Sequence, residues 1–149
     1  MLPFGNLTAT VNLSGAEMKA ALDNGVSRMP AVDGRFPQVS GLCFTYNIEA
    51  PVGARVVSAV RQGPGGSCSG AAVDLTATST YSVALNDFMA NGGDGYPVVI
   101  SRAVTRNPLD ADTTAYVQGN SPLAPALQGR IVCTDPNPGV GNNCPVTLP

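Results

Sequence analysis

The chain has 149 residues, a net charge of −2 and 12% charged residues, with 17 Gly and 13 Pro. This length suits one compact domain with its own core, and the many Gly and Pro residues favour short elements joined by turns over an all-helical bundle. The single Lys and seven Arg are dispersed and no apolar run approaches the roughly 20 residues that span a bilayer, so we expect neither a nucleic acid partner nor a membrane span.

The most strongly patterned segment lies near the start of the chain. Residues 8–13 alternate as a half-buried strand should, and Ser14 and Glu17 have the spacing of a helix-capping box. A helix is therefore expected from Ser14. Gly25 and the proline at position 30 should end this helix by about Arg28.

The remaining elements are predicted from β-forming residues, turn residues and capping patterns. The loop at 62–70 carries Cys68, and the run at 91–95, Asn-Gly-Gly-Asp-Gly, must also be a loop because of its glycines. A short turn is expected at 88–90 and a short helix from Asp110 through Val117. Strands are expected at 38–47, 55–60, 81–85 and 128–133, and residues 96–103 are expected to form a strand or an extended segment.

Interleaved helices and hairpins favour an α+β fold with a mixed, largely antiparallel sheet and a few helices. We expect residues 1–133 to form one domain. Residues 134–149 contain repeated prolines and glycines and are expected to form an irregular tail tied down by a disulfide.

The four cysteines form no Cys-x-x-Cys pair, and the chain contains no His, so a zinc cluster is not expected. Two disulfides are favoured over four buried thiols, because the count is even and the chain is rich in Gly and Pro. Proximity in the sequence predicts the pairs Cys43–Cys68 and Cys133–Cys144. Disulfides in turn indicate a secreted, periplasmic or cell-surface protein.

The absence of His also limits the chemistry that this chain can perform. Without imidazole, neither a Ser-His-Asp triad nor a His-ligated metal centre can form. Carboxylates such as Asp23, Glu49 and Asp74 lie in helix or turn contexts where solvated surface is the ordinary role. We therefore expect no catalytic residue, no metal ligand and no cofactor in this chain, which alone should not be an enzyme.

The loop at 91–95 is the most informative for binding. Its Gly-Gly-Asp-Gly sequence lets the backbone turn tightly and approach a ligand, with the carboxylate of Asp94 at the tip. Such a carboxylate can accept hydrogen bonds from two hydroxyl groups, as in a ribose diol. Taken alone, the same sequence also fits an ordinary tight turn with Asp94 solvated.

Several segments, in order, resemble the C-terminal domain of the 5'-nucleotidase family, which includes UDP-sugar hydrolases and ecto-nucleotidases. The most specific are Leu-Pro-Phe-Gly-Asn at 2–6 and Asn-Asp-Phe-Met-Ala-Asn-Gly-Gly-Asp-Gly-Tyr at 86–96. Shorter matches gain weight from their order. They lie at 13–17, 34–41, 53–56, 81–84 and 129–131.

The resemblance implies a nucleoside-binding site built from aromatic rings, glycines and a carboxylate. In that family a base is held between two aromatic rings, which here correspond to Phe4 and Phe88. Asn6 and Gly34 would line the base. The Gly-Gly-Asp-Gly segment, with Gly93 and Asp94, would bind the ribose hydroxyls.

The resemblance also implies what lies outside this chain. The parent would be a metal-dependent phosphatase that hydrolyses nucleotide phosphomonoesters, with two divalent metal ions in an N-terminal metallophosphatase domain that this chain lacks. That domain, in cis, and a nucleoside or nucleotide are the expected partners. The alternative is a non-enzymatic extracellular binding module that keeps the fold, whereas the capped helix at Ser14 disfavours a free-standing adhesin-like β-domain.

Overall fold

The structure is a computed structural model that describes residues 4–124, 126–141 and 143–145. The chain divides into two compact units, each built from two separate stretches. Unit 1 contains Met1–Leu13 and Thr80–Leu127, and unit 2 contains Ser14–Ser79 and Gln128–Pro149. Each unit is described by itself.

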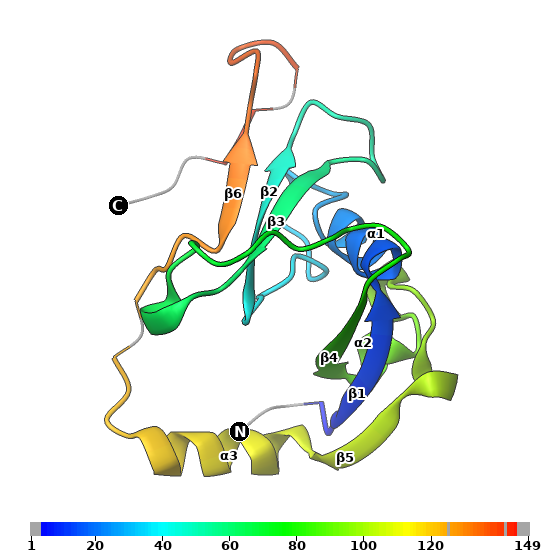
Figure 1. Cartoon of the computed structure of the whole chain (residues 1–149), viewed down its shortest axis with the longest axis vertical. Coiled ribbons are helices and arrows are strands. Elements are labelled where there is room, and N and C mark those ends of the chain that lie inside the picture. The colour runs from blue at the N-terminus through cyan, green and yellow to red at the C-terminus, as the bar shows by residue number, and fades with distance from the viewer. Residues whose placement is uncertain (1–3, 125, 142, 146–149) are drawn as a thin grey trace. The chain divides into compact units, whose positions relative to one another are not determined.

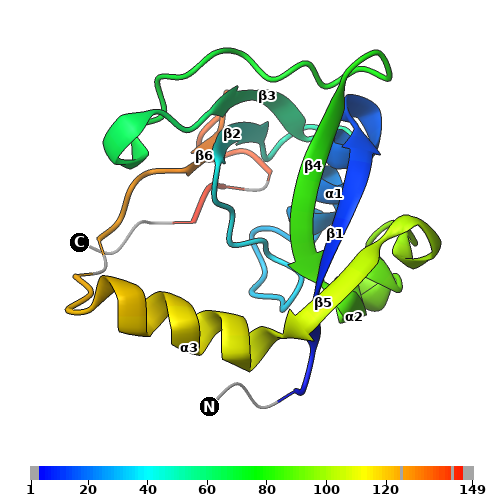
Figure 2. The same ribbon diagram turned by 60° about the horizontal axis from the view of Figure 1, so that its bottom comes forward.

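Unit 1 is organised around a three-stranded sheet with β1 in the centre. The strand order is β4-β1-β5, and β1 pairs antiparallel with β5 so that Ala9 lies opposite Thr105. Figure 2 shows α3 continuing from the end of β5. The bounds are β1 Leu7–Ser14, β4 Thr80–Asn86 and β5 Val104–Pro108.

The core of unit 1 forms because β1 alternates between buried and outward-facing residues. Ala9, Val11 and Leu13 are buried with Ala90 and Val99, and partly buried aliphatic side chains pack against them. Four helical segments complete this unit. They are α2 (Asp87–Ala90), the 3₁₀ turns η2 (Gly93–Gly95) and η3 (Ile100–Arg102), and α3 (Leu109–Asn120).

Unit 2 begins with helix α1 (Gly15–Gly25), whose start has the predicted capping box. The Ser14 hydroxyl accepts a hydrogen bond from the Glu17 backbone N–H, and the Glu17 carboxylate accepts one from the Ser14 N–H. Met18 and Leu22 are buried on one side of α1, as their helical spacing predicts.

The sheet of unit 2 is mixed. Strands β2 (Leu42–Asn47) and β3 (Val56–Arg61) form an antiparallel hairpin, and β6 (Ile131–Thr134) pairs with β2 in parallel. Figure 1 shows β2 between the other two strands, in the order β3-β2-β6. Phe44 and Tyr46 of β2 are both 2% exposed and supply much of the buried volume.

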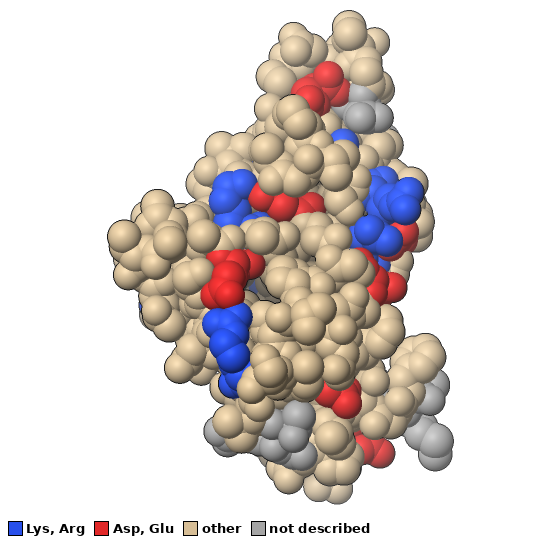
Figure 3. Space-filling model, turned by 90° about the vertical axis from the view of Figure 1, so that its right-hand side faces the viewer, with Lys and Arg blue, Asp and Glu red and all other residues tan. Residues whose placement is uncertain are grey.

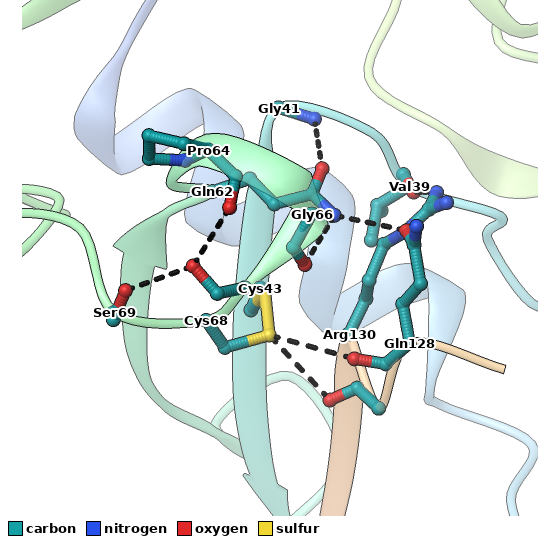
Figure 4. Close-up of a disulfide and its surroundings, with 12 residues drawn as sticks. Val39, Gly41, Cys43, Gln62, Pro64, Gly66, Cys68, Ser69, Gln128 and Arg130 are labelled. Atoms are coloured by element: carbon teal, nitrogen blue, oxygen red, sulfur yellow. Dashed lines mark hydrogen bonds between the residues drawn. A yellow bond between two sulfur atoms is a disulfide. The ribbon is translucent and has the colours of Figure 1, made fainter.

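Both disulfides lie in unit 2. Cys43 of β2 is bonded to Cys68, which follows the short 3₁₀ turn η1 (Pro64–Gly66), and Cys133 of β6 is bonded to Cys144. Around the first disulfide, the Gln62 side chain donates to the Gly66 carbonyl and accepts from the Gly41 N–H (Figure 4). The disulfide and this amide together hold the loop at 62–70 against the β2–β3 hairpin.

The α+β fold with mixed sheets is as predicted, whereas residues 96–103, expected as a strand or an extended segment, form no strand. That segment contains η3 instead, and the neighbouring strand β5 starts only at Val104. The backbone curls there because the N–H groups of Arg102 and Ala103 bond back to the carbonyls of Val99 and Ile100.

One element boundary also differs from the prediction. Helix α1 ends at Gly25, within the predicted limit, whereas the predicted strand at 38–47 is regular only from Leu42. Gly41 has a φ of 81°, which interrupts the extended backbone before β2. The proposed boundary between a domain at 1–133 and a tail at 134–149 stays a prediction.

Candidate functional site

The predicted binding loop begins where strand β4 ends. The side chain of Asn86 accepts a hydrogen bond of 2.8 Å from the Met89 N–H and so caps α2. Helix α2 is a single turn, closed by the Asn91 N–H bonding to the Asp87 carbonyl at 2.9 Å. The result is a short, defined platform that carries Phe88.

The turn after α2 depends on three residues with positive φ. Gly92 has a φ of 89°, Asp94 of 54° and Gly95 of 78°. Asp94 is the only described residue other than glycine with positive φ, a conformation that costs free energy in most contexts and is tolerated best by Asn and Asp. The turn thus fixes the exposed Asp94 side chain at its tip.

Buried residues hold both ends of this turn. Tyr96, directly after it, is 8% exposed, and Val99 is 4% exposed. The Val99 N–H donates to the carbonyl of Ala90, the last residue of α2, at 2.8 Å. The loop is thus flanked by buried residues on both sides, of which Ala90 and Val99 belong to the core of unit 1.

Phe88 and Gly93 are in direct contact. A methyl group placed on Gly93 would lie 2.4 Å from Cε1 and 2.5 Å from Cζ of the Phe88 ring. The ring thus rests against the Gly93 backbone while the Phe88 residue stays 48% exposed. A half-exposed, supported ring is a surface on which a flat, aromatic ligand can stack.

The segment that carries Asn6 is fastened to the same loop. The Leu7 N–H donates to the Asp87 carboxylate at 2.9 Å, and the Leu109 N–H donates to the Asn6 carbonyl at 2.8 Å. These bonds hold the start of β1 against α2 on one side and the start of α3 on the other. The segment that carries Asn6 is therefore joined by a hydrogen bond to α2, the helix that carries Phe88.

Asp87 was not among the residues that the sequence predicted for the site. Its carboxylate joins two predicted parts of the site, yet at the first position of a helix an acidic residue is common for reasons of helix stability alone. The signal that could have found it is that Asp87 lies within the segment that resembles the family.

The other two predicted residues are less constrained. Phe4 is in a turn and is 81% exposed, and no ring contact joins it to Phe88 in the described part of the chain. Gly34 belongs to unit 2, where it is exposed between Asp33 and Arg35. The Asp33 carboxylate accepts hydrogen bonds from the backbone N–H and Nε of Arg35, which lowers the pKa of Asp33.

Unit 2 also has an open hollow of about 520 Å³ beside the end of α1. It is open, and its lining carries charges of both signs, from Asp23 and from Arg28 and Arg35. Blue and red side chains likewise lie next to each other in several places on the face drawn in Figure 3. The residues lining the hollow are Ala20, Asp23, Asn24, Ser27, Arg28, Arg35, Val52 and Gly53.

The part of the chain that the structure describes contains no group of three or more His, Cys, Asp or Glu side chains arranged to hold a metal ion. None of the described helices is long and apolar enough to cross a membrane.

Comparison with known proteins gives the same family as the sequence motifs. Residues 1–101 match the family described as 5'-nucleotidase, C-terminal domain. The trifunctional nucleotide phosphoesterase YfkN of Bacillus subtilis is 32% identical over 136 residues, which are 88% of this chain and 9% of that protein. Human 5'-nucleotidase is 31% identical over 135 residues, 88% of this chain and 23% of that protein.

Solved structures are similar over nearly the same stretch. A 5'-nucleotidase precursor from Thermus thermophilus has a TM-score of 0.71 and 37% identity, with 89% of this chain and 26% of that chain covered. The NAD nucleotidase of Haemophilus influenzae has a TM-score of 0.72 at 19% identity, covering 90% of this chain and 25% of that one, which supports the fold alone. This chain thus spans about a quarter of these structures.

Proposed function

Because the chain belongs to the family of 5'-nucleotidase C-terminal domains, we propose that it binds the nucleoside part of a nucleotide substrate. The observation that carries this proposal is the loop of unit 1, in which the half-exposed ring of Phe88 rests on Gly93, directly before the exposed residue Asp94. The ring stacks on a base and the carboxylate accepts hydrogen bonds from the ribose diol.

The other predicted residues would contribute to the same nucleoside site. Asn6 lies on the segment fastened to Asp87, and Phe4, two residues before it, is the second aromatic candidate for the base. Gly93 supports the Phe88 ring. Gly34, in unit 2, stays a prediction that rests on the family resemblance alone.

The proposal extends to a longer parent protein. This chain spans 9% of the Bacillus phosphoesterase and 23% of human 5'-nucleotidase, whose names describe nucleotide hydrolysis. We infer a parent with an N-terminal metallophosphatase domain that holds two divalent metal ions and hydrolyses nucleotide phosphomonoesters. In that parent this chain would orient the nucleoside, which accelerates a reaction by fixing the geometry of its substrate.

The proposed location is outside the cytoplasm. Two disulfides link the four cysteines of the chain, and disulfides persist mainly in oxidising compartments. Similarity to a 5'-nucleotidase from snake venom, at 30% identity over 142 residues, points the same way. A secreted, periplasmic or cell-surface parent fits these observations.

The test is an NMR titration of this chain with adenosine. A stacked ring contributes about 1–3 kcal/mol per base, much of which is offset by the freedom lost on binding, so we expect weak binding, with a Kd of about 1 mM or above. Phe88→Ala should weaken adenosine binding about five-fold or more, so that the shifts saturate only at much higher adenosine concentrations. Asp94→Asn should weaken adenosine more than 2',3'-dideoxyadenosine, which has no diol.

Matched controls come from α3 of the same unit. Tyr116→Ala removes an aromatic ring that is 62% exposed, and Asp110→Asn neutralises an exposed carboxylate, and neither change should alter the titration. If Phe88→Ala and Asp94→Asn bind adenosine like the parent chain, or if AMP binds far better than adenosine, the proposal fails. The non-enzymatic binding module would then be the better description.

A further inference from the structure

Gly93 lies under the edge of the Phe88 ring. A methyl group at position 93 would meet three ring carbons, at 2.4 Å from Cε1, 2.5 Å from Cζ and 2.6 Å from Cδ1. Carbon atoms in van der Waals contact lie about 3.5–4.0 Å apart, so no side chain can occupy position 93 while the ring keeps its place. The contact requires a glycine there.

The backbone itself does not impose this requirement. Gly92 and Gly95 have φ values of 89° and 78°, which favour glycine for conformational reasons. Gly93 is not among the residues with positive φ, so an alanine could adopt its backbone conformation without strain. Among the three glycines of this loop, the one at 93 is thus set apart by the ring that covers it.

The position of Gly93 links the two halves of the proposed binding loop. Phe88 projects from the single turn of α2, which is capped by Asn86, and Asp94 is the residue directly after Gly93. The Tyr96 N–H donates to the Gly93 carbonyl at 3.1 Å, and Tyr96 is buried. The Phe88 ring therefore rests on the backbone directly before Asp94.

We propose that Gly93 is a positioning residue, which acts on the nucleoside through the Phe88 ring rather than by contacting the ligand. This inference rests on the proposed function, because it explains what holds the Phe88 ring in the position in which it can stack on a base. Without the contact, a half-exposed ring samples other rotamers, and a ligand must then select the one that stacks. Gly93 keeps that rotamer populated.

The decisive variant is Gly93→Ala. The clashing atoms are the far end of a half-exposed side chain, so the ring can swing away and the chain should fold with a melting temperature near that of the parent. Adenosine binding should weaken about five-fold or more, as expected when one stacked ring is lost. The preference for adenosine over 2',3'-dideoxyadenosine should persist, because Asp94 keeps its backbone.

Two companion variants isolate the coupling. Gly119→Ala, in α3, is a matched control, since a methyl group there would meet no atom within 4 Å and φ is not positive. Gly119→Ala should bind adenosine as the unmutated chain does. In the Phe88→Ala background, adding Gly93→Ala should cause no further loss, because residues that act through one another are not additive.

The outcomes separate this inference from the proposed function. If the unmutated chain does not bind adenosine at all, the proposed function is wrong and so is the role of Gly93 that depends on it. If the parent binds and Gly93→Ala binds equally well, or if Gly93→Ala weakens binding further in the Phe88→Ala background, only this inference is overturned. A measurement that needs no variant at 93 is the Gly93 Hα resonance, which should move when Phe88→Ala removes the ring, and an unmoved resonance would contradict the contact.

Discussion

Among single residues, Asp74 organises the loop that precedes β4. Its carboxylate accepts hydrogen bonds from the Ser79 hydroxyl at 2.6 Å and from the Thr76 N–H at 2.9 Å. The carbonyls of Thr76 and Ser79 in turn accept the first two backbone N–H groups of α1, from Ala16 and Gly15. The Asp74 carboxylate thus organises a loop whose carbonyls accept hydrogen bonds from backbone N–H groups that have no partner within the first turn of a helix.

We predict that Asp74→Asn reduces stability in a manner that depends on pH. Hydrogen bonds from Ser79, then Thr76, hold the pKa of Asp74 well below its usual 3.8. A lowered pKa in the folded state contributes stability that is present above the unfolded value and is lost as the pH falls through the folded value. The difference in melting temperature between parent and variant should therefore be full at neutral pH and shrink below about pH 4.

Thermal scans of both proteins from neutral to strongly acidic pH give the measurement. A difference that stays constant across this range would mean that the variant acts by a route other than the charge of Asp74.

The binding loop shows how far residue-level prediction from the sequence reaches. The glycines of Gly-Gly-Asp-Gly predict a tight loop with Asp94 at its tip, and the structure has both. The separate role of Gly93 could not be predicted, because it depends on where the Phe88 ring points. The Leu7–Asp87 hydrogen bond was equally hidden, since it joins positions that are far apart in the chain.

At the level of elements, a buried arginine ties the end of α1 to the β2–β3 hairpin. Arg55 is 4% exposed, and its guanidinium donates to the carbonyls of Val26 at 2.8 Å and Met29 at 2.9 Å, beyond the end of α1. It also donates to the Ala50 carbonyl in the hairpin turn at 3.2 Å. The positive charge is favourable beside carbonyls at a helix C-terminus.

Arg55→Met should lower the free energy of unfolding by about 2 kcal/mol or more, because the carbonyls of Val26, Met29 and Ala50 all lose their hydrogen bonds from the buried guanidinium. The free energy of unfolding of Arg55→Lys should lie between those of the unmutated chain and Arg55→Met, since an ammonium keeps the charge but lacks the planar geometry of the guanidinium. Urea denaturation followed by circular dichroism measures both. Arg61→Met, at an exposed position of β3, is the control, and an equal loss there would contradict the assigned role of Arg55.

The elements that could be predicted are those specified by local sequence. The capping box at Ser14 and the residues 81–85 of β4 are correct, because capping and alternation act over a few neighbouring residues. Residues 96–103 form no strand, because Tyr96 and Val99 are buried within a curled backbone rather than by pairing in a sheet. Burial of β-forming residues does not require a strand.

For the molecule as a whole, the sequence predicted the family and the α+β class, and both are confirmed. It did not predict the parallel pairing of β6 with β2, because that contact joins the two separate stretches of unit 2. Nor did it predict the division into two units, each assembled from separate stretches, since a unit of that kind leaves no boundary in the local composition.

Removing either disulfide should destabilise unit 2 by a similar amount. The bridges close segments with sequence separations of 25 and 11, which on the chain-entropy model corresponds to about 3 kcal/mol each. Thermal unfolding of Cys43→Ser/Cys68→Ser and of Cys133→Ser/Cys144→Ser measures the two effects. A thiol assay on the unfolded, unreduced parent should detect no free cysteine, and free thiols or crossed pairs in peptide mapping would contradict the pairing.

The order of these cysteines bears on how the protein is made. When a chain crosses into an oxidising compartment from its N-terminus, Cys43 and Cys68 arrive before Cys133 and Cys144, so the first bridge can close before the cysteines of the second one are present. The second pair then arrives together, with β6, and completes the sheet beside a strand whose own bridge is already in place. In a chain exported in this direction, the order of arrival would favour the native pairing of these four cysteines in addition to their proximity in the sequence.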